Sequence, residues 1–520
     1  MARLFRNLLL GGTLGGLACG YYLLRELPVP SASGPAYQLL PKRPYSEHPN
    51  KHFLTREPRT IGIVGGGLAG LTTAKVLSQQ GFQVEVLEKG PRIGGVWVEN
   101  YQDAALQGPF YHYNIPDFPF PKGVSFFPKQ SEVLQHFDNY VETFQLKPLI
   151  SLNSEVATVA QDREGSWTVT LKSGVQRKYD FLVLSTGQFY RPYIPPIPGL
   201  ASFSGKVLHS FYVRNAKELF AGKRVVIVGG GKSAYDLLTL AAQHSGTVTG
   251  IMREIHWTIP ASDQIYRREV MNWAICKLSE LLNPPPYKPK TWLTWVFRQL
   301  GNVYWELLAE EVAKDLPDSL KPTSDIRVRK NRGTDIRDME LISRVQKGEV
   351  AIVQGAIEEV TAEGIRVSNL FIPADILVLS TGFQPTTFGL AGKDEAFWLY
   401  QGIIDPKIRN FAVIGYGNVA CTVLKVNLQA AWLCDLLRGS VSLPSLATMQ
   451  AQVQAYEAAM RAAYGQERPY AYAYARSEYS YYDSLLTDMH VQTRRTTTVL
   501  EDLIGIPDPL AYKLVLTHRV

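Results

Sequence analysis

Apolar runs of strand length alternate with glycine turns and helical patterns over two separate stretches of the chain. In the first stretch, the apolar run 61–64 is typical of a buried parallel strand, and a helical pattern follows over residues 71–80. A second β-rich run, 83–87, ends at Glu88. A strand, a helix and a strand in this order predict the start of a Rossmann-like unit.

Three glycines separate the first strand from its helix. Gly65 allows a tight turn, Gly67 lets the backbone approach a pyrophosphate, and Gly70 lets the helix pack closely on the strand. Glu88 follows Gly70 by 18 residues, at a position where a carboxylate can bind ribose hydroxyls. The pattern therefore predicts a bound dinucleotide. The alternative is a glycine-rich turn without a ligand.

The same order of elements returns as a strand over 224–228, a helix over 235–243 and a strand over 247–252. Gly229 and Gly231 hold the first two glycine positions of the turn between the first strand and the helix. The sequence thus predicts a second dinucleotide-binding unit, and an α/β fold with two Rossmann-like domains.

The residue after the second strand differs between the two units. It is Glu88 in the first and Arg253 in the second. A carboxylate suits a bare ribose, whereas an arginine suits the 2′-phosphate of NADPH, and Lys232 could add positive charge near the phosphates. We therefore expect FAD in the first unit and NADPH in the second. The alternative is that Arg253 only faces solvent.

One strand-like segment occurs twice with seven of eight residues identical, as DFLVLSTG at 180–187 and DILVLSTG at 375–382. We interpret the two copies as the points where the chain crosses between a cofactor domain and a domain inserted into it. Each copy ends where the backbone must pass close to another group, so we expect their last two residues at the cofactor sites: Thr186, Gly187, Thr381 and Gly382.

Composition limits the remaining possibilities. A chain of 520 residues is too long to fold around one hydrophobic core, so two or three domains are expected. The net charge of +7 comes without a Lys/Arg run of the nucleic-acid type, so it fits a phosphorylated cofactor or an anionic membrane better than a nucleic acid. The four cysteines form no C-x-x-C motif, which argues against a disulfide reductase.

The N-terminal region, 1–27, contains 17 uncharged residues at 8–24. This length is near the lower limit for a membrane-spanning helix. We expect a single N-terminal anchor in an endomembrane or organelle, with the catalytic part in the cytosol. Alternatives are a cleaved targeting peptide and a helix buried against the globular part. Residues 28–58 are expected to be a linker.

At this point the residues resemble a known family, the flavin-containing monooxygenases (FMO type). Phe203-x-Gly205-x-x-x-His209 is similar to the beginning of the family signature, although its last aromatic position is Val213 here. Further similar motifs are Gly94-Gly95-x-Trp97, DFPFP at 117–121, the glycine turn with Lys232 and Ser233, and NLQAAW at 427–432. The resemblance covers about residues 59–437.

The resemblance implies a division of the chain. The FAD domain would comprise residues 59–202 and 331–440, and the NADPH domain with a helical insertion would comprise 203–330. A helical, tyrosine-rich region, 441–520, would follow. Cofactor contacts would come from both glycine turns, from Gly95 and Trp97, and from His209, which we interpret mainly as a structural link between domains.

The implied activity is an NADPH-dependent monooxygenase reaction. NADPH would reduce FAD, reduced FAD would trap O₂ as a C4a-hydroperoxyflavin, and an amine or sulfide would take the distal oxygen. Asn114 falls at the family's active-site asparagine, although Tyr113 precedes it in place of the usual Thr. Baeyer–Villiger oxygenation and a redox-sensing flavoprotein without catalysis remain alternatives.

Overall fold

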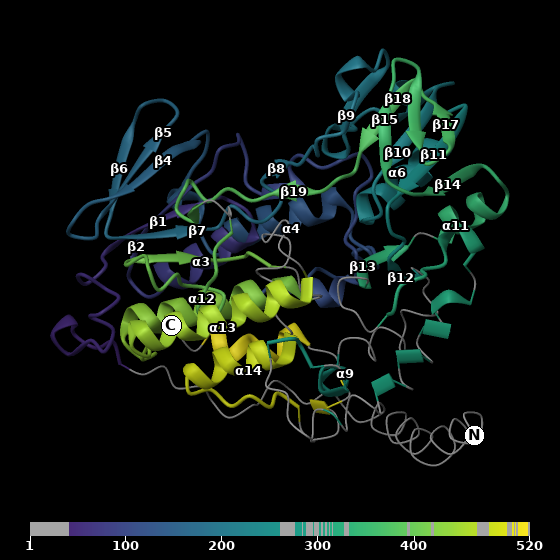
Figure 1. The fold of residues 1–520 in the computed structure, drawn as a ribbon. Coiled ribbons are helices and arrows are strands. Elements are labelled where there is room, and N and C mark those ends of the chain that lie inside the picture. Colours follow the sequence, from purple (N-terminus) through teal and green to yellow (C-terminus); the bar gives the residue numbers. More distant parts are fainter. Residues whose placement is uncertain are drawn as a thin grey trace.

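In the computed structural model, two parallel β-sheets form separate units connected by short crossing segments (Figure 1). The structure describes residues 41–260, 332–337, 339–392, 396–417, 421–464 and 478–496, and parts of 276–326 and 502–517. The expected anchor at 8–24 and residues 28–40 of the expected linker lie outside these residues, while Phe53 and Leu54 in the described remainder of that linker are fully buried in the core. Among the helices that are described, none is both long and apolar enough to cross a membrane.

The first sheet has the order β20-β7-β1-β2-β3, and all its strands are parallel. The apolar run predicted as the first strand is β1, and α3 begins three residues earlier than the helical pattern suggested. The elements are β1 (Thr60–Val64), α3 (Leu68–Ser78), β2 (Gln83–Leu87), β3 (Ile150–Ser151), β7 (Phe181–Leu184) and β20 (Phe411–Val413).

The second sheet repeats this arrangement in the order β14-β11-β10-β18-β9, again all parallel. The helix after the second glycine turn also begins three residues before its predicted start. The elements are β9 (Lys206–His209), β10 (Arg224–Val228), α6 (Lys232–Ala242), β11 (Thr247–Met252), α11 (Met339–Gln346), β14 (Val350–Gln354) and β18 (Ile376–Leu379).

Each unit also carries a three-stranded antiparallel sheet. In the first unit it comes just before β7, which pairs with β1, and in the second unit just before β18, which pairs with β10. One comprises β4 (Val156–Gln161), β5 (Trp167–Leu171) and β6 (Gln176–Tyr179); the other comprises β15 (Ile357–Val360), β16 (Gly364–Val367) and β17 (Leu370–Pro373). The repeated DxLVLSTG segment is therefore the same structural strand in both units: β7 beside β1, and β18 beside β10.

This topology corrects the domain boundary expected at residue 331. Both β14 and β18 pair within the second sheet, β14 in parallel with β11 at the edge and β18 in parallel with β10, where all four residues of β18 are buried. The chain returns to the first sheet only with β20. The two crossings meet in a short antiparallel pair, β8 (Arg191–Pro192) with β19 (Phe383–Gln384). The repeats themselves are therefore strands within the two sheets and not the crossing points. Each crossing begins directly after one of the repeats.

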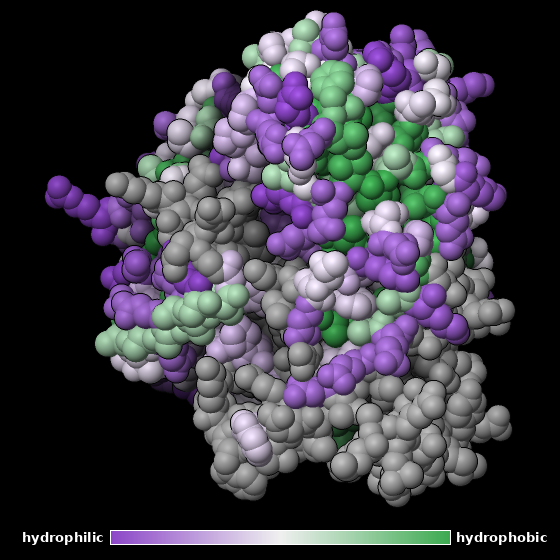
Figure 2. Space-filling model, turned by 45° about the vertical axis from the view of Figure 1, so that its right-hand side comes forward, coloured by the Kyte–Doolittle hydropathy of each residue, from purple (hydrophilic) through white to green (hydrophobic). Residues whose placement is uncertain are grey.

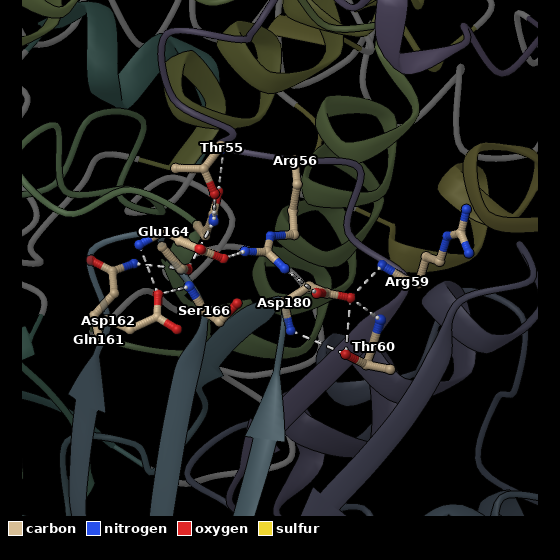
Figure 3. Close-up of polar contacts among 11 residues, drawn as sticks. Thr55, Arg56, Arg59, Thr60, Gln161, Asp162, Glu164, Ser166 and Asp180 are labelled. Carbon is tan, nitrogen blue, oxygen red and sulfur yellow. Dashed lines mark hydrogen bonds and ion pairs between the residues drawn. The ribbon is translucent and has the colours of Figure 1, made fainter.

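The aspartate of each repeat fastens the beginning of its sheet. Asp180 Oδ2 accepts hydrogen bonds from the backbone N–H groups of Arg59 and Thr60, both at 3.0 Å, and Arg56 lies beside it (Figure 3). Asp375 Oδ2 likewise accepts from the Arg224 backbone N–H at 2.8 Å. Burial raises the pKa of Asp180, but the hydrogen bonds from Thr60 and Arg59 outweigh it, so the pKa is lowered.

Helices cover the first sheet. A long buried helix, α12 (Thr422–Arg438), packs against α3, and α14 (Glu478–Asp488) packs on α12, as Figure 1 shows. The described tyrosines of the C-terminal cluster serve this packing: Tyr481 donates to the Gln401 carbonyl and Tyr482 to the Cys421 carbonyl. The other main helices are α4 (Gln130–Thr143), α5 (Ala216–Phe220), α9 (Lys277–Leu282), α13 (Leu446–Tyr464) and α16 (Lys513–Thr517), and a further strand pair joins β12 (Trp257–Pro260) to β13 (Arg332–Arg337).

Only part of the expected helical insertion belongs to the described residues. There, Trp305 is buried and Trp295 is exposed, so the tryptophans of this region do not share one role. On the face drawn in Figure 2, hydrophobic side chains gather in the upper part, bordered by hydrophilic ones.

Candidate cofactor sites

The first glycine turn lies at the carboxyl edge of the first sheet, and its glycines have different physical requirements. Gly65 has φ of 114°, and a Cβ there would lie 2.6 Å from the Ser185 carbonyl oxygen. A Cβ at Gly70 would overlap the Gly65 carbonyl oxygen. Gly67 differs, because the nearest atom to a Cβ would be Gly95 Cα at 3.5 Å, an ordinary contact. The protein itself thus tolerates a side chain at Gly67, which fits the position where the backbone approaches a pyrophosphate.

Glu88 lies over this turn, as its position after β2 predicted. Its Oε2 accepts from the Gly66 N–H at 2.7 Å and its Oε1 accepts from the Gly90 N–H at 2.8 Å. The side chain is buried, and each oxygen keeps a second lone pair. The two backbone donors therefore fix the carboxylate at the edge of the turn, in a place suited to ribose hydroxyls.

A second pair of glycines closes over the first turn. The Gly94 N–H donates to the Gly66 carbonyl at 3.0 Å, and a Cβ on Gly95 would lie 3.1 Å from Gly67 Cα. Gly95 has φ of 59°, a conformation that favours glycine. Trp97 follows in a short 3₁₀ helix, and its carbonyl accepts from Gln130 Nε2 on α4. The expected grouping of Gly95 with the first turn is thus observed.

Asn114 follows the 3₁₀ helix η4 (Phe110–Tyr113) and is buried. Its Oδ1 accepts from the Phe120 N–H at 2.9 Å, while its amide nitrogen makes no hydrogen bond within the described residues. The Asn114 amide N–H groups therefore remain available to a ligand on this side of the first unit, where η4 contacts α12.

The end of the first repeat packs against a residue that the sequence reasoning missed. Thr186 Oγ1 lies 2.6 Å from the Tyr416 hydroxyl, and that hydroxyl donates to the Thr386 carbonyl at 2.8 Å, so Thr186 is the donor. Burial raises the pKa of Tyr416, which keeps it protonated. Gly187 has φ of 70° and no atom near its Cβ position. A G-Y-G sequence after the apolar strand β20 was the signal for Tyr416.

The second glycine turn repeats the geometry of the first. A Cβ on Gly229 would overlap the Ser380 carbonyl oxygen, just as Gly65 faces Ser185. Gly231 caps α6, and Ser233 lies in the first turn of that helix. In the second repeat, Thr381 Oγ1 donates to the Tyr193 carbonyl, and Gly382 has φ of 86°.

Two charged residues near the second turn behave differently. Lys232 forms an ion pair with Asp236 one helical turn away, and Asp236 also accepts from the Tyr101 hydroxyl at 2.7 Å. The charge of Lys232 is therefore largely neutralised, contrary to the expectation that it adds positive charge at the phosphates. Arg253 is exposed at the end of β11 and has no partner among the described residues. Of the two, only Arg253 is available to an anionic ligand.

His209 fastens β9 to the second crossing. Its Nδ1 accepts from the Phe211 N–H at 3.2 Å, so its Nε2–H donates to the Gly382 carbonyl at 3.0 Å. Burial lowers the pKa of His209 to about 4, against the smaller raising effect of the Gly382 carbonyl. Both ring nitrogens are engaged by the backbone, which agrees with a structural link and leaves neither nitrogen for a cofactor.

Two dinucleotide-binding units of the same topology, one with a carboxylate over its glycine turn and one with an exposed arginine, define an oxidoreductase that uses two dinucleotides. The model of the family described as FMO-like, flavin-binding monooxygenase-like, matches residues 58–503. The chain belongs to this family, whose members are NADPH-dependent flavin monooxygenases with FAD as cofactor.

Similar proteins cover most of the chain. Mouse flavin-containing monooxygenase 1 is 24% identical over 85% of this chain and 85% of its own length, and a Baeyer–Villiger monooxygenase of Streptomyces coelicolor is 27% identical over 75% and 80%. Among solved structures, the S-allyl-L-cysteine S-oxygenase of Allium sativum has a TM-score of 0.60 at 20% identity, covering 86% of this chain and 92% of that one. The complex of OTEMO with FAD and NADP has a TM-score of 0.59 at 19% identity, over 78% and 91%. These structures share the fold.

Proposed function

We propose that this flavin monooxygenase oxygenates the nitrogen or sulfur atom of a small molecule, with FAD in the first unit and NADPH in the second. The observation that carries the cofactor assignment is the difference between the two glycine turns. Glu88 is held over the first by two backbone donors, and Arg253 stands exposed beside the second. A buried carboxylate repels the 2′-phosphate of NADPH, whereas an exposed guanidinium binds it.

Bound FAD, reduced by NADPH, supplies the oxygen-activating chemistry. The residues of the chain bind, orient and exclude water. The first turn of α3 and Gly67 hold the pyrophosphate, Glu88 holds the ribose, and the Asn114 amide donates a hydrogen bond at the flavin. Since the oxygen is activated on the cofactor, the substrate needs only a soft nucleophilic atom and no protein nucleophile.

The sulfide class is supported by one similar structure, the S-allyl-L-cysteine S-oxygenase of Allium sativum, and the amine class by the resemblance to the flavin-containing monooxygenases. The Baeyer–Villiger relative from Streptomyces coelicolor supports a second candidate function, insertion of oxygen beside a ketone. The two candidates give chemically distinct products, a sulfoxide or N-oxide in one case and an ester in the other.

The test is a substrate panel of thioethers, tertiary amines and cyclic ketones, assayed with NADPH and oxygen and followed by mass spectrometry. Sulfoxide or N-oxide formation that rises with enzyme concentration is the expected result. Ester as the main product would replace the proposal by the Baeyer–Villiger alternative. NADPH oxidation that yields only hydrogen peroxide with all three classes would contradict both and favour a redox-sensing flavoprotein.

We also propose that residues 8–24 attach the protein to an intracellular membrane. Support comes from the sequence alone, namely the 17 uncharged residues bounded by arginines. The full chain should remain in the membrane pellet after carbonate washing, and a chain lacking residues 1–27 should not. Release of the full chain by carbonate, or a mature N-terminus beyond residue 27, would contradict an anchor.

A further inference from the structure

A buried ion pair connects the first nucleotide-binding helix to the loop that carries Asn114. Lys75 lies on α3, and its ammonium group pairs with Asp117, which lies between η4 and α4. The two side chains are only 2% and 3% exposed. A surface ion pair contributes little, but a buried one is strongly destabilising to break because it leaves an uncompensated charge.

The loop around Asp117 is closed on itself, so the position of Asp117 determines that of Asn114. The Phe118 N–H donates to the Ile115 carbonyl, and the Phe120 N–H donates to Asn114 Oδ1, both at 2.9 Å. Asp117 lies at the tip of this turn, three residues after Asn114. These two hydrogen bonds hold the short segment together, and Lys75 is its charged attachment to α3.

The surroundings of the pair contain no second cation within the described residues that contacts Asp117. Lys75 Nζ lies 4.6 Å from the centre of the Phe144 ring, and Phe144 packs on Tyr140. Asp117 Oδ1 and the Tyr140 hydroxyl are buried without a hydrogen-bond partner there. Asp117 therefore depends on Lys75.

We propose that the Lys75–Asp117 ion pair is a positioning pair that holds the Asn114 amide in register with the dinucleotide turn. This rests on the proposed function in so far as Asn114 is taken to face the flavin. The pair transmits the placement of α3, whose N-terminus holds the pyrophosphate, to the amide. It thereby fixes the distance between the N-terminus of α3 and the Asn114 amide, the two groups proposed to contact the same FAD.

The experiment is a double-mutant cycle of Lys75→Met and Asn114→Ala in the full chain. Three quantities are measured well below the unfolding temperature: the Kd for FAD, the visible circular dichroism of bound flavin, and the oxygenated product formed per NADPH. Asn114→Ala should change the dichroism and weaken FAD binding about 10-fold, the worth of one lost hydrogen bond. Lys75→Met should give the same spectral change, and the double variant should be no worse than Asn114→Ala alone.

Two variants separate positioning from stability. Tyr140→Phe removes a buried hydroxyl from the same cluster and should leave all three quantities within about twofold, because that hydroxyl is not part of the Lys75–Asp117 ion pair. Asp180→Ala destabilises the same sheet at its other end and should keep the normal flavin spectrum. If Lys75→Met does not fold, Lys75→Met is combined with Asp117→Leu, which removes the attachment without leaving an uncompensated buried charge.

The proposal would be overturned if the fold-change in the Kd for FAD in the double variant equalled the product of the two single fold-changes. A normal flavin spectrum in Lys75→Met would overturn it as well. Since FAD binding and dichroism require no turnover, these results stand even if no substrate is oxygenated. Failure of the wild-type chain to oxygenate the substrate panel would instead refute the proposed function. A wild-type chain that binds no FAD would refute both.

Discussion

Gly67 offers a substitution that separates the cofactor from the fold. A Cβ at this position would lie 3.5 Å from its nearest neighbour, the Gly95 Cα atom. The backbone φ is −80°, which alanine adopts freely. Gly67→Ala should therefore cost the apoprotein no more than about 1 kcal/mol, the usual penalty for alanine at a helix N-cap. The methyl group would occupy the space of the pyrophosphate and remove about two charge-assisted hydrogen bonds. The expected loss is about 3 kcal/mol, roughly 100-fold in the Kd for FAD.

The assay is fluorescence titration of the apoprotein with FAD, together with thermal unfolding without FAD. Gly123→Ala is the matched control, because Gly123 lies in an exposed turn with positive φ and open space, so it should lose a little stability and no affinity. Gly70→Ala should fail at the level of folding, since its methyl group overlaps the Gly65 carbonyl. Undiminished FAD affinity in Gly67→Ala would refute the placement of the pyrophosphate.

Three further predictions concern the second cofactor, pH and the sheet edge. Arg253→Ala should raise the KM for NADPH about 10-fold and leave that for NADH unchanged, because only NADPH carries the 2′-phosphate; equal effects in steady-state kinetics would show that Arg253 does not recognise it. Burial lowers the pKa of His112, His136 and His209 to about 4, so the unfolded chain binds more protons below pH 6.5. Stability in urea should fall between pH 7 and pH 5 by about 1–2 kcal/mol per histidine, and His136→Phe should make the fall smaller; a flat profile would contradict these environments. Asp180→Ala should cost about 2 kcal/mol, because two backbone N–H groups at the start of β1 lose their acceptor; unchanged urea unfolding would argue against this role.

The sequence predicted the two βαβ units well because their determinants are local. Strands over 83–87, 224–228 and 247–252 were predicted to the residue, since each is an apolar run bounded by turn residues. The two helices began three residues early, because glycine turns supply the N-cap directly at Gly67 and Gly231.

The pairing of strands that lie far apart in the chain could not be predicted from local sequence patterns. The second repeat was assigned to the FAD domain, but its strand pairs with β10, and no local pattern distinguishes the two possible sheets. The same limit explains Lys232, whose partner Asp236 neutralises it, and the buried pair of Lys75 with Asp117. Each depends on a side chain that reaches a residue chosen by tertiary packing.

We propose that this chain transfers one atom of O₂ to a soft nucleophile at the expense of NADPH. The most direct measurement is turnover of a thioether and a tertiary amine under ¹⁸O₂, with NADPH consumption and hydrogen peroxide followed in the same samples. We predict one ¹⁸O atom in the sulfoxide or N-oxide and about one product per NADPH consumed, as a coupled flavin monooxygenase requires. Product without ¹⁸O, or NADPH consumption matched entirely by hydrogen peroxide, would contradict a monooxygenase activity.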